Sequence, residues 1–422
     1  MEATAIINEL ADKARLAART LIAATGAERS AALVAIAEEI LKSEGEILAA
    51  NAQDMVRAKA DGMSDSMQDR LLLTPKRVAD IADGAIQVSK LPNPIGLTIN
   101  ENRLPNGLHL KQVSVPFGVV GMVYEARPNV TVDAAVILLM SANAALLRGS
   151  SSAAESNEVL VKVMKRALAK TNISAEVLQL VPSHDRSTVT ALLHARGKVD
   201  LVIPRGSAAL IRTVVDESTV PTIETGAGVC HVYVDDQADL TKALPILINS
   251  KIHRPSVCNA AETLLVHQGI AAKFLPIALK ALAEAGVTLN VDEATKKFAD
   301  EIGVKVNLAG EENWSTEYNA LEMNVAIVPD ILSAADHIAK YGTKHTEAIV
   351  SESEENAAKF ISLLDAAAIM VNASTRFTDG EQMGFGAEIG ISNQKLHARG
   401  PMGLVAMTTT TWIVTGNGQI RA

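Results

Sequence analysis

Cys258 is the residue whose setting in the sequence most strongly suggests chemistry. It lies in residues 254–263, after a loop stiffened by Pro255 and at the predicted start of a short helix. A thiolate attacks carbonyl carbon, and the free N–H groups of a helix start, together with the charge of Arg254, are expected to lower the thiol pKa. Cys258 is therefore a candidate nucleophile, although a free cysteine taken alone is more often a small buried core residue.

Two other segments carry groups that such a nucleophile needs. Glu224 ends an apolar stretch and precedes the turn Gly226-Ala227-Gly228, whose glycines allow the backbone to approach a ligand closely. Asn129 follows Pro128 after an apolar strand, and its amide could donate a hydrogen bond to a developing oxyanion. Without Cys258, the glutamate would be read as the end of a strand and the asparagine as a helix cap.

The elements around these residues alternate in a regular order. Amphipathic helices are predicted between residues 6 and 60, and a β-hairpin between residues 97 and 115 around an Asn-Gly turn. Strands and helices then alternate from residue 119 to a strand ending at Glu224, and again from residue 230 to residue 371. This alternation favours parallel sheets covered by helices.

Composition excludes several classes of function. The chain has 422 residues and a net charge of −9, which disfavours a surface that binds nucleic acid by neutralising phosphates. Its longest apolar run, residues 134–140, is too short to span a bilayer, and acidic residues near the N-terminus interrupt any secretory signal. Two cysteines, Cys230 and Cys258, cannot build a disulfide framework, and no metal-binding motif is present. We expect a cytoplasmic protein without a bound metal.

Four motifs together resemble the aldehyde dehydrogenase superfamily and, within it, the gamma-glutamyl phosphate reductase family. The resemblance extends from about residue 116 to about residue 411 and rests on residues 124–131, 257–260, 372–380 and 395–403. This chain has Gly149-Ser150 and Gly206-Ser207 where the family usually has glycine pairs, and Ser256 where it often has glycine. The resemblance implies an α/β fold with two doubly wound domains and a small β oligomerisation element.

The same resemblance implies how the chain divides into domains. Residues 1–95 and 116–226 would form the cofactor-binding domain, and residues 227–390 the catalytic domain. Residues 96–115 and 404–422 would form the oligomerisation hairpin and C-terminal strand, while residues 391–403 return to the cofactor-binding domain. An exposed strand at residues 404–414 needs a partner, which favours a homodimer or higher homo-oligomer.

A nicotinamide cofactor is implied by the resemblance, but the usual dinucleotide fingerprint Gly-x-Gly-x-x-Gly is absent from the first half of the chain. Two predicted strand ends that precede helices are suited to phosphate, although their serines could equally be plain helix caps. The positive charge of Arg148 would suit the 2′-phosphate of NADPH. The residues expected to bind the cofactor are Arg148, Gly149, Ser150, Pro204, Arg205, Gly206, Ser207 and Glu322.

The implied reaction is the NADPH-dependent reduction of L-glutamyl 5-phosphate to L-glutamate 5-semialdehyde and phosphate, through a thioester on Cys258, in L-proline biosynthesis. Asn129 would stabilise the oxyanion, and Glu224 matches the superfamily's general base. His345 is a weaker candidate for the site. The residues expected to bind this anionic substrate are Arg127, Arg254, Thr375, Arg376 and Arg399.

Other interpretations remain open. A hydrolytic aldehyde dehydrogenase would share Cys258, Asn129 and Glu224 but would not depend on phosphate. A non-catalytic α/β protein that binds a metabolite or nucleotide would have an unreactive Cys258. Docking with glutamate 5-kinase, which makes the unstable substrate, is a further partner hypothesis.

Overall fold

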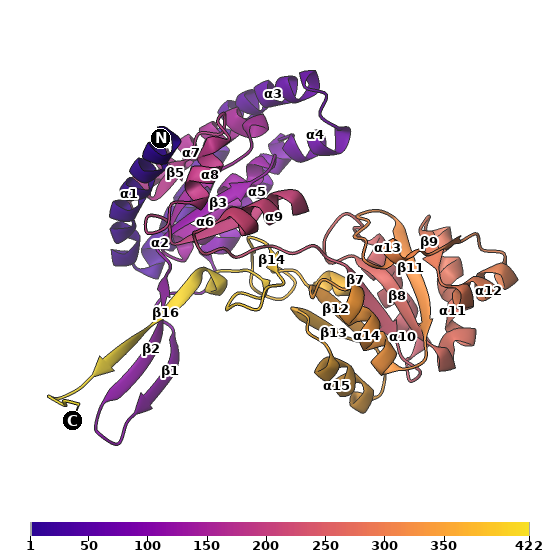
Figure 1. Cartoon of the computed structure of the whole chain (residues 1–422). Helices are drawn as coiled ribbons and strands as arrows, with labels where there is room; N and C mark the ends of the chain where they lie inside the picture. The colour runs from indigo at the N-terminus through magenta and orange to yellow at the C-terminus, as the bar shows by residue number, and fades with distance from the viewer. Residues whose placement is uncertain (1, 422) are drawn as a thin grey trace.

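The computed structural model describes residues 2–421 and contains two parallel sheets, a three-stranded antiparallel arm and a short two-stranded element. In Figure 1 the indigo and magenta residues form one α/β unit, and the orange residues form a second unit beside it. The expected α/β fold with parallel sheets and covering helices is confirmed.

Five helices precede the first sheet. In the first helix Ile7, Ala11 and Ala14 recur at spacings of three and four and are fully buried, so one face packs against the unit's core. Thr25 opens the second helix with a capping box, in which its hydroxyl and the carboxylate of Glu28 each accept a backbone N–H. The helices are α1 (Glu2–Ala23), α2 (Gly26–Lys42), α3 (Glu44–Ala60), α4 (Asp65–Leu71) and α5 (Pro75–Ser89).

The first sheet has four parallel strands in the order β5-β4-β3-β6. All six residues of β3 are buried, as expected for a parallel strand covered on both faces. The predicted strand before Glu224 is wrong, since only Thr222 makes an isolated bridge, to Val202. The elements are β3 (Val119–Tyr124), α6 (Pro128–Met140), β4 (Ala144–Arg148), η1 (Ser151–Ala153), α7 (Ala154–Leu168), η2 (Ala175–Val177), β5 (Leu178–Leu180), α8 (Ser187–Leu193), β6 (Leu201–Arg205) and α9 (Ala208–Glu217).

The second sheet has seven parallel strands in the order β10-β9-β11-β8-β7-β12-β13. A core of aliphatic side chains from β7, β8 and the following helix fills one of its faces. The elements are β7 (Cys230–Val234), α10 (Leu240–Ile252), β8 (Ala261–His267), α11 (Gln268–Glu284), β9 (Thr288–Val291), α12 (Glu293–Ile302), β10 (Asn307–Leu308), α13 (Glu311–Trp314), β11 (Glu322–Val328), α14 (Ile331–Tyr341), β12 (Thr346–Val350), α15 (Glu354–Leu363), β13 (Ala368–Val371) and η3 (Thr375–Phe377).

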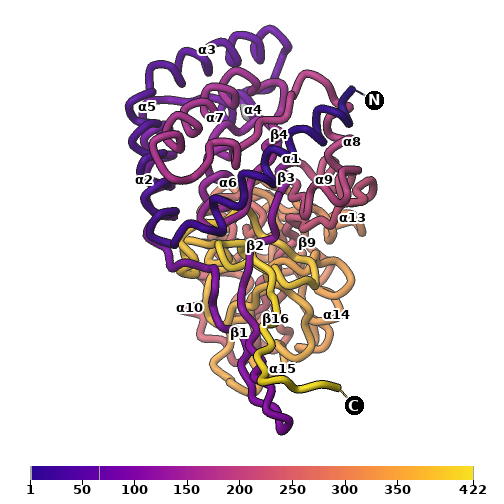
Figure 2. Tube along the Cα trace, turned by 90° about the vertical axis from the view of Figure 1, so that its left-hand side faces the viewer, coloured from indigo at the N-terminus to yellow at the C-terminus, as the bar shows by residue number. Residues whose placement is uncertain are grey.

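The antiparallel arm joins two segments from opposite ends of the sequence. Its order is β1-β2-β16, with β1 (Thr98–Arg103), β2 (His109–Pro116) and β16 (Thr408–Thr415). Figures 1 and 2 both show it projecting beyond the α/β units, with the C-terminus beside it. In the sequence, the two-stranded element of β14 (Ile391–Ser392) and β15 (Gly400–Pro401) comes first, and η4 (Val405–Met407) then leads into β16.

Candidate active site

The predicted site residues lie where the carboxyl edge of the first sheet faces the amino edge of the second. Asn129, Arg148 and Arg205 follow or end strands of the first sheet, whereas Glu224 and Cys258 precede β7 and β8 of the second. Gly390 packs against both edges at once. An added Cβ at Gly390 would lie within 2.7 Å of Arg205, which ends β6 of the first sheet, and of Thr225, which precedes β7 of the second. Residues far apart in the sequence are therefore assembled between the two units.

Cys258 lies in a turn between α10 and β8, and the predicted helix start at this residue is wrong. Only two residues separate the cysteine from β8, which leaves no room for a helix. The next residue holds the turn in place, because the Asn259 amide donates to the carbonyl of Thr378 at 2.8 Å. The hydroxyl of Thr375 in turn donates to the carbonyl of Asn259 at 2.7 Å. The C-terminal polar segment thus supports the nucleophile loop.

The glycine turn after Glu224 packs directly against Cys258. A Cβ added at Gly228 would lie only 1.5 Å from the carbonyl oxygen of Cys258, so only glycine fits at this position. The same carbonyl accepts a hydrogen bond from Sγ of Cys230 at 3.2 Å. Cys230 is fully buried, whereas Cys258 is partly exposed. Of the two thiols, Cys258 is the one that a substrate can reach.

The unliganded surroundings of Cys258 favour the thiol over the thiolate. Burial raises the pKa of Cys258 to about 11; the charge of Arg205 opposes this rise, and Glu317 and Glu388 add to it. The prediction that a helix start and Arg254 lower this pKa is therefore wrong. The cause is that dense packing removes water from the sulfur, and the turn supplies no helix dipole. A proton must leave Cys258 before it can attack carbon.

Asn129 lies in the first turn of α6, which begins at Pro128, a favoured first helical residue. Its side-chain nitrogen donates to Asp133 one turn later at 2.8 Å. Burial raises the pKa of Asp133 to about 6, while the hydrogen bond from Asn129 opposes the rise. An amide carries two N–H donors, so one remains for a substrate oxygen while Asp133 orients the group. Sequence reasoning missed Asp133. The available signal was its position four residues after Asn129, which places the two side chains next to each other on a helix.

Three of the predicted substrate arginines are brought together. The pKa of Arg127 is lowered by burial and by the nearby charges of Arg205, Arg70 and Arg254. Burial also lowers the pKa of Arg376; the carboxylate of Asp379 opposes this shift, and the charge of Arg254 adds to it. These mutual effects show a concentration of positive charge beside the nucleophile, which suits an anionic ligand.

The other two predicted substrate residues have internal partners. Arg399 donates to Asp365 at 2.7 Å, and Lys344 and Lys395 pair with the same carboxylate. These cations hold the pKa of Asp365 well below its usual range. Thr375 is fully buried and holds the nucleophile loop, as described above. In this state both residues support the site without opening onto it.

The first predicted cofactor segment follows β4. Arg148 is 8% exposed and donates to the carbonyls of Gly149, Ser183 and Asp185. A Cβ at Gly149 would lie 2.2 Å from the amide of Asn157, which explains the need for glycine. Ser150 caps η1 through the N–H of Ser152. Its capping role and a role in cofactor binding are compatible.

The second cofactor segment, which includes Pro204 and Gly206, leads from β6 into α9. Ser207 caps α9 by accepting the N–H of Leu210. The Ser207 N–H and hydroxyl both donate to the carboxylate of Glu125, at 2.8 and 2.7 Å. A negatively charged group therefore occupies the N-terminus of this helix, the position where a helix attracts phosphate.

Two carboxylates that sequence reasoning missed, Glu317 and Glu388, act on the pKa of Cys258. Glu322, at the start of β11, accepts from Asn290 at 2.9 Å and belongs to a polar network within the second unit. Glu317, which sequence reasoning missed, accepts the N–H of Gly228 at 2.9 Å and raises the pKa of Cys258. Burial raises the pKa of a further carboxylate, Glu388, to about 7. The backbone of Glu224 donates to the side chain of Gln394 at 3.1 Å, which ties the turn to the C-terminal polar segment.

His345 lies beside Cys230, the buried cysteine whose thiol donates to the carbonyl of Cys258. It is fully buried, its Nδ1 lies 3.8 Å from Sγ of Cys230 and 2.8 Å from the hydroxyl of Thr346, and burial lowers its pKa to about 4. A neutral imidazole in this position packs behind the site.

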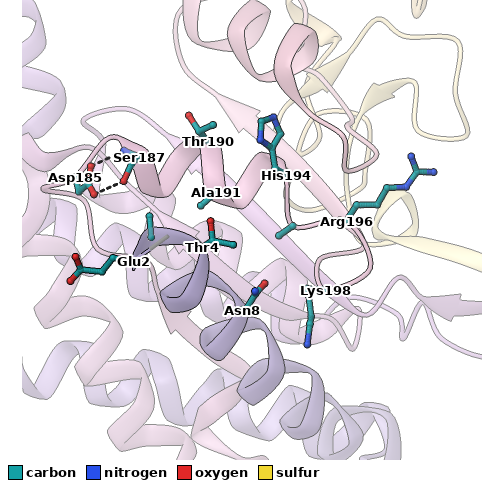
Figure 3. A pocket seen from close by; sticks show the side chains of 12 residues that line it. Glu2, Thr4, Asn8, Asp185, Ser187, Thr190, Ala191, His194, Arg196 and Lys198 are labelled. Atoms are coloured by element: carbon teal, nitrogen blue, oxygen red, sulfur yellow. Dashed lines mark hydrogen bonds between the residues drawn. The ribbon is translucent and has the colours of Figure 1, made fainter.

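Cavities lie both away from and next to these residues. One of about 590 Å³ lies between α1 and α8 and contains none of the predicted site residues; Figure 3 shows side chains such as Thr4, Asn8 and His194 around it. Another of about 240 Å³ borders the site and is lined by Asp133 and Glu388. Among residues 2–421, no group of three His, Cys, Asp or Glu side chains is arranged to hold a metal, and no single helix is long and apolar enough to cross a membrane.

Comparison with known proteins identifies the family. Residues 2–301 match the aldehyde dehydrogenase family. A gamma-glutamyl phosphate reductase from Thermobifida fusca is 52% identical over 415 residues, which cover 98% of each chain. The structure of a gamma-glutamyl phosphate reductase from Thermotoga maritima superposes with a TM-score of 0.95 at 44% identity, over 99% of this chain and 100% of that one. An engineered glycolyl-CoA reductase with bound NADP⁺ shares the fold at 17% identity, with a TM-score of 0.67 over 97% and 96% of the two chains. The chain therefore belongs to the gamma-glutamyl phosphate reductases of the aldehyde dehydrogenase family.

Proposed function

We propose that this chain catalyses the NADPH-dependent reduction of L-glutamyl 5-phosphate to L-glutamate 5-semialdehyde and phosphate, a step of L-proline biosynthesis. The observation that carries the proposal is the packing of the Glu224–Gly228 turn against a reachable Cys258, with Asn129 and a group of arginines at the same sheet edges. The names of relatives about 50% identical supply the substrate.

The first step is acyl transfer to Cys258. Its sulfur attacks the acyl carbon, a carbon–sulfur bond forms, and the bond to the phosphate oxygen breaks, which leaves a thioester and free phosphate. Because burial raises the thiol pKa to about 11, a base must take the proton. Glu224 is the proposed base, and Glu388, with a pKa of about 7, stands close enough to influence the same sulfur. Both are testable by substitution to glutamine.

Charge on the former carbonyl oxygen increases in both chemical steps. The second N–H of the Asn129 amide and the backbone N–H of Cys258 are the proposed donors to this oxygen. Asp133 holds the amide in one orientation, so the donor does not have to be reorganised during the reaction. Arg127, Arg254 and Arg376 are proposed to bind the phosphate and carboxylate of the substrate. Thr375 and Arg399 are proposed to act indirectly, by holding the segments that carry these groups.

The residues at the first sheet's carboxyl edge fit a nicotinamide dinucleotide. The N-terminus of α9 already binds an oxyanion, the carboxylate of Glu125, so its Ser207 N–H and hydroxyl can hold a cofactor phosphate. Arg148 and Ser150 are proposed to bind the adenosine half, and the charge of Arg148 favours NADPH. When bound, the nicotinamide supplies the hydride that converts the thioester to a thiohemiacetal, from which the aldehyde and the free thiol form.

A carboxylate is expected near the nicotinamide ribose. The nicotinamide must lie next to the thioester carbon, and its ribose is the adjoining group. Glu317 lies against Gly228 and acts on the pKa of Cys258, whereas the carboxylate of Glu322 is bound to Asn290. We therefore propose Glu317, instead of Glu322, for this contact.

The deciding experiment is the reverse reaction. Purified protein is incubated with NADP⁺ and glutamate 5-semialdehyde, with and without inorganic phosphate, and nicotinamide reduction is followed for the unmodified chain and Cys258→Ala. Turnover that requires phosphate and disappears in the variant supports the proposal. Turnover without phosphate would assign a hydrolytic aldehyde dehydrogenase with Glu224 as base. No turnover under either condition would contradict both activities and favour a binding protein.

A further inference from the structure

Two charged side chains flank the nucleophile loop. Lys251 lies in the last turn of α10, and Glu262 is the second residue of β8, so the connection that contains Cys258 runs between them. Nζ of Lys251 lies 2.6 Å from Oε2 of Glu262, and both side chains are fully buried. The ion pair therefore joins the two ends of the loop.

The pair is costly to bury. Burial lowers the pKa of Lys251 and raises the pKa of Glu262 to about 7, even though each group opposes the shift of the other. Oε1 of Glu262 makes no well-formed hydrogen bond among residues 2–421, although the backbone of Asn319 lies close enough to lower the pKa of this carboxyl in part. An incompletely satisfied buried ion pair is commonly no more stabilising than two packed apolar side chains of similar volume. Stability of the fold is thus a weak reason for having it.

Other contacts hold the middle of the loop and each of its two ends separately. The carbonyl of Cys258 accepts from Cys230, and the carbonyl of Asn259 accepts from Thr375. At the ends of the loop, Ser250 ties α10 to Ser374 and Thr375, and pairing with β7 holds the start of β8, but neither contact joins α10 directly to β8. A short, directional ion pair joins these two elements.

We propose that the Lys251–Glu262 pair is a positioning clamp, which sets the geometry of the nucleophile loop so that the sulfur of Cys258 faces the acyl carbon of the substrate and its N–H faces the acyl oxygen. The inference rests on the proposed function for the identity of the substrate. The effect of the clamp on the loop can also be measured without substrate, through the alkylation rate of Cys258. Placement errors of about 1 Å cost up to about 100-fold in rate, so a loosened loop has a large kinetic signature.

The test is the double variant K251M/E262M, which keeps the volume but removes both charges. We expect the thermal unfolding midpoint to be unchanged or higher, kcat to fall about tenfold or more, and KM for NADPH to stay the same. We also expect faster alkylation of Cys258 by iodoacetamide, measured by mass spectrometry, because a loosened loop lets water reach the sulfur and burial no longer disfavours the thiolate as strongly. The matched control is K242M/E352M, which removes an exposed Lys–Glu pair from the other end of α10 and should leave all four quantities unchanged.

Three results would overturn the clamp. Unchanged kcat and alkylation would show that the loop does not need the pair. A fall in unfolding midpoint that parallels the loss of turnover would make the pair an ordinary stabilising contact. A change confined to KM would assign it to ligand binding. Alkylation needs no substrate, so a protein that lacks phosphate-dependent turnover would contradict the proposed function and still report on the clamp.

Discussion

At the scale of single residues, the site contains groups whose charge states are set by packing. Cys258 is reachable but surrounded by protein, so its thiol is the favoured form until a ligand or base changes its environment. Asn129 is oriented by Asp133, and the N–H of Gly228 donates to the carboxylate of Glu317. Each reactive group thus has a neighbour that the motif sequences alone did not reveal.

The first prediction concerns the reactivity of Cys258. With a pKa of about 11, Cys258 is mostly protonated between pH 7 and 9, so its thiolate fraction should rise about tenfold for each pH unit. The labelling rate should rise by the same factor, because only the thiolate reacts. Iodoacetamide labelling of Cys258, followed by mass spectrometry in the absence of ligands, measures this. Buried Cys230 in a Cys258→Ser variant provides the background. A labelling rate that levels off below pH 8 would contradict the high pKa.

The second prediction concerns Glu125, whose carboxylate occupies the N-terminus of α9. If the cofactor's pyrophosphate takes that position, the carboxylate competes with it, and Glu125→Ala should tighten NADPH binding several-fold. Titration calorimetry with NADPH, in the absence of the acyl substrate, measures the change in the dissociation constant for NADPH. Glu217→Ala, which removes the same charge from the other end of α9, is the control. Weaker NADPH binding in Glu125→Ala would show instead that the carboxylate supports the cofactor loop.

At the scale of elements, close backbone approach decides the geometry. The turn before β7 can lie on the loop before β8 only because Gly228 has no side chain. Strand β7 pairs directly with β8, so the two loops that enter these strands are neighbours by sheet topology. The parallel sheet thereby brings Glu224 and Cys258 to one edge.

The third prediction follows from this approach. Gly228→Ala would place Cβ 1.5 Å from the Cys258 carbonyl oxygen, so the nucleophile loop must move. We expect kcat to fall by about 100-fold or more. Gly45→Ala, whose Cβ meets nothing within 4 Å on helix α3, should keep full activity and gain up to about 1 kcal/mol of stability. Steady-state kinetics and thermal unfolding of both variants make the comparison, and a fully active Gly228→Ala would rule out the close packing.

At the scale of the whole molecule, the antiparallel arm exposes large apolar side chains to solvent. Strand β16 is exposed along residues 409–415, and Trp412, Ile413 and Val414 are each about half exposed. An exposed apolar strand at a sheet edge favours pairing with another chain. We propose a homodimer or higher homo-oligomer formed through this arm.

The fourth prediction tests that assembly. Light scattering of the purified chain should give a mass that is a multiple of 44.5 kDa, and W412E/V414E should shift it towards a single chain, since buried unpaired carboxylates oppose association. The control L16E/V56E makes the same change at two exposed apolar helix positions outside the arm. A monomeric unmodified chain, or an unchanged mass in W412E/V414E, would exclude the arm as the interface.

The amino-acid sequence was enough to predict the α/β class, the order of most strands and helices, and the family. It also singled out Cys258, Asn129 and Glu224, whose chemical roles stay predictions. These inferences depend on local periodicity and on residues in short motifs, which the sequence contains directly. Helices α4, α5, α12, α13 and α15 were not predicted; α4 and α13, with seven and four residues, are too short for a helical period to stand out in the sequence. The strand before Glu224 failed because its pairing reduces to one bridge.

Tertiary structure alone decided the environment of the site. The helix start predicted at Cys258 is a turn, and the thiol pKa is raised because burial outweighs the nearby positive charge. The placement of Glu317, Asp133 and the Lys251–Glu262 pair also depends on which segments the sheets bring together. Residue types show which chemistry is available, but the free energy of each charge state depends on distance and solvent exposure, and these exist only in the folded chain.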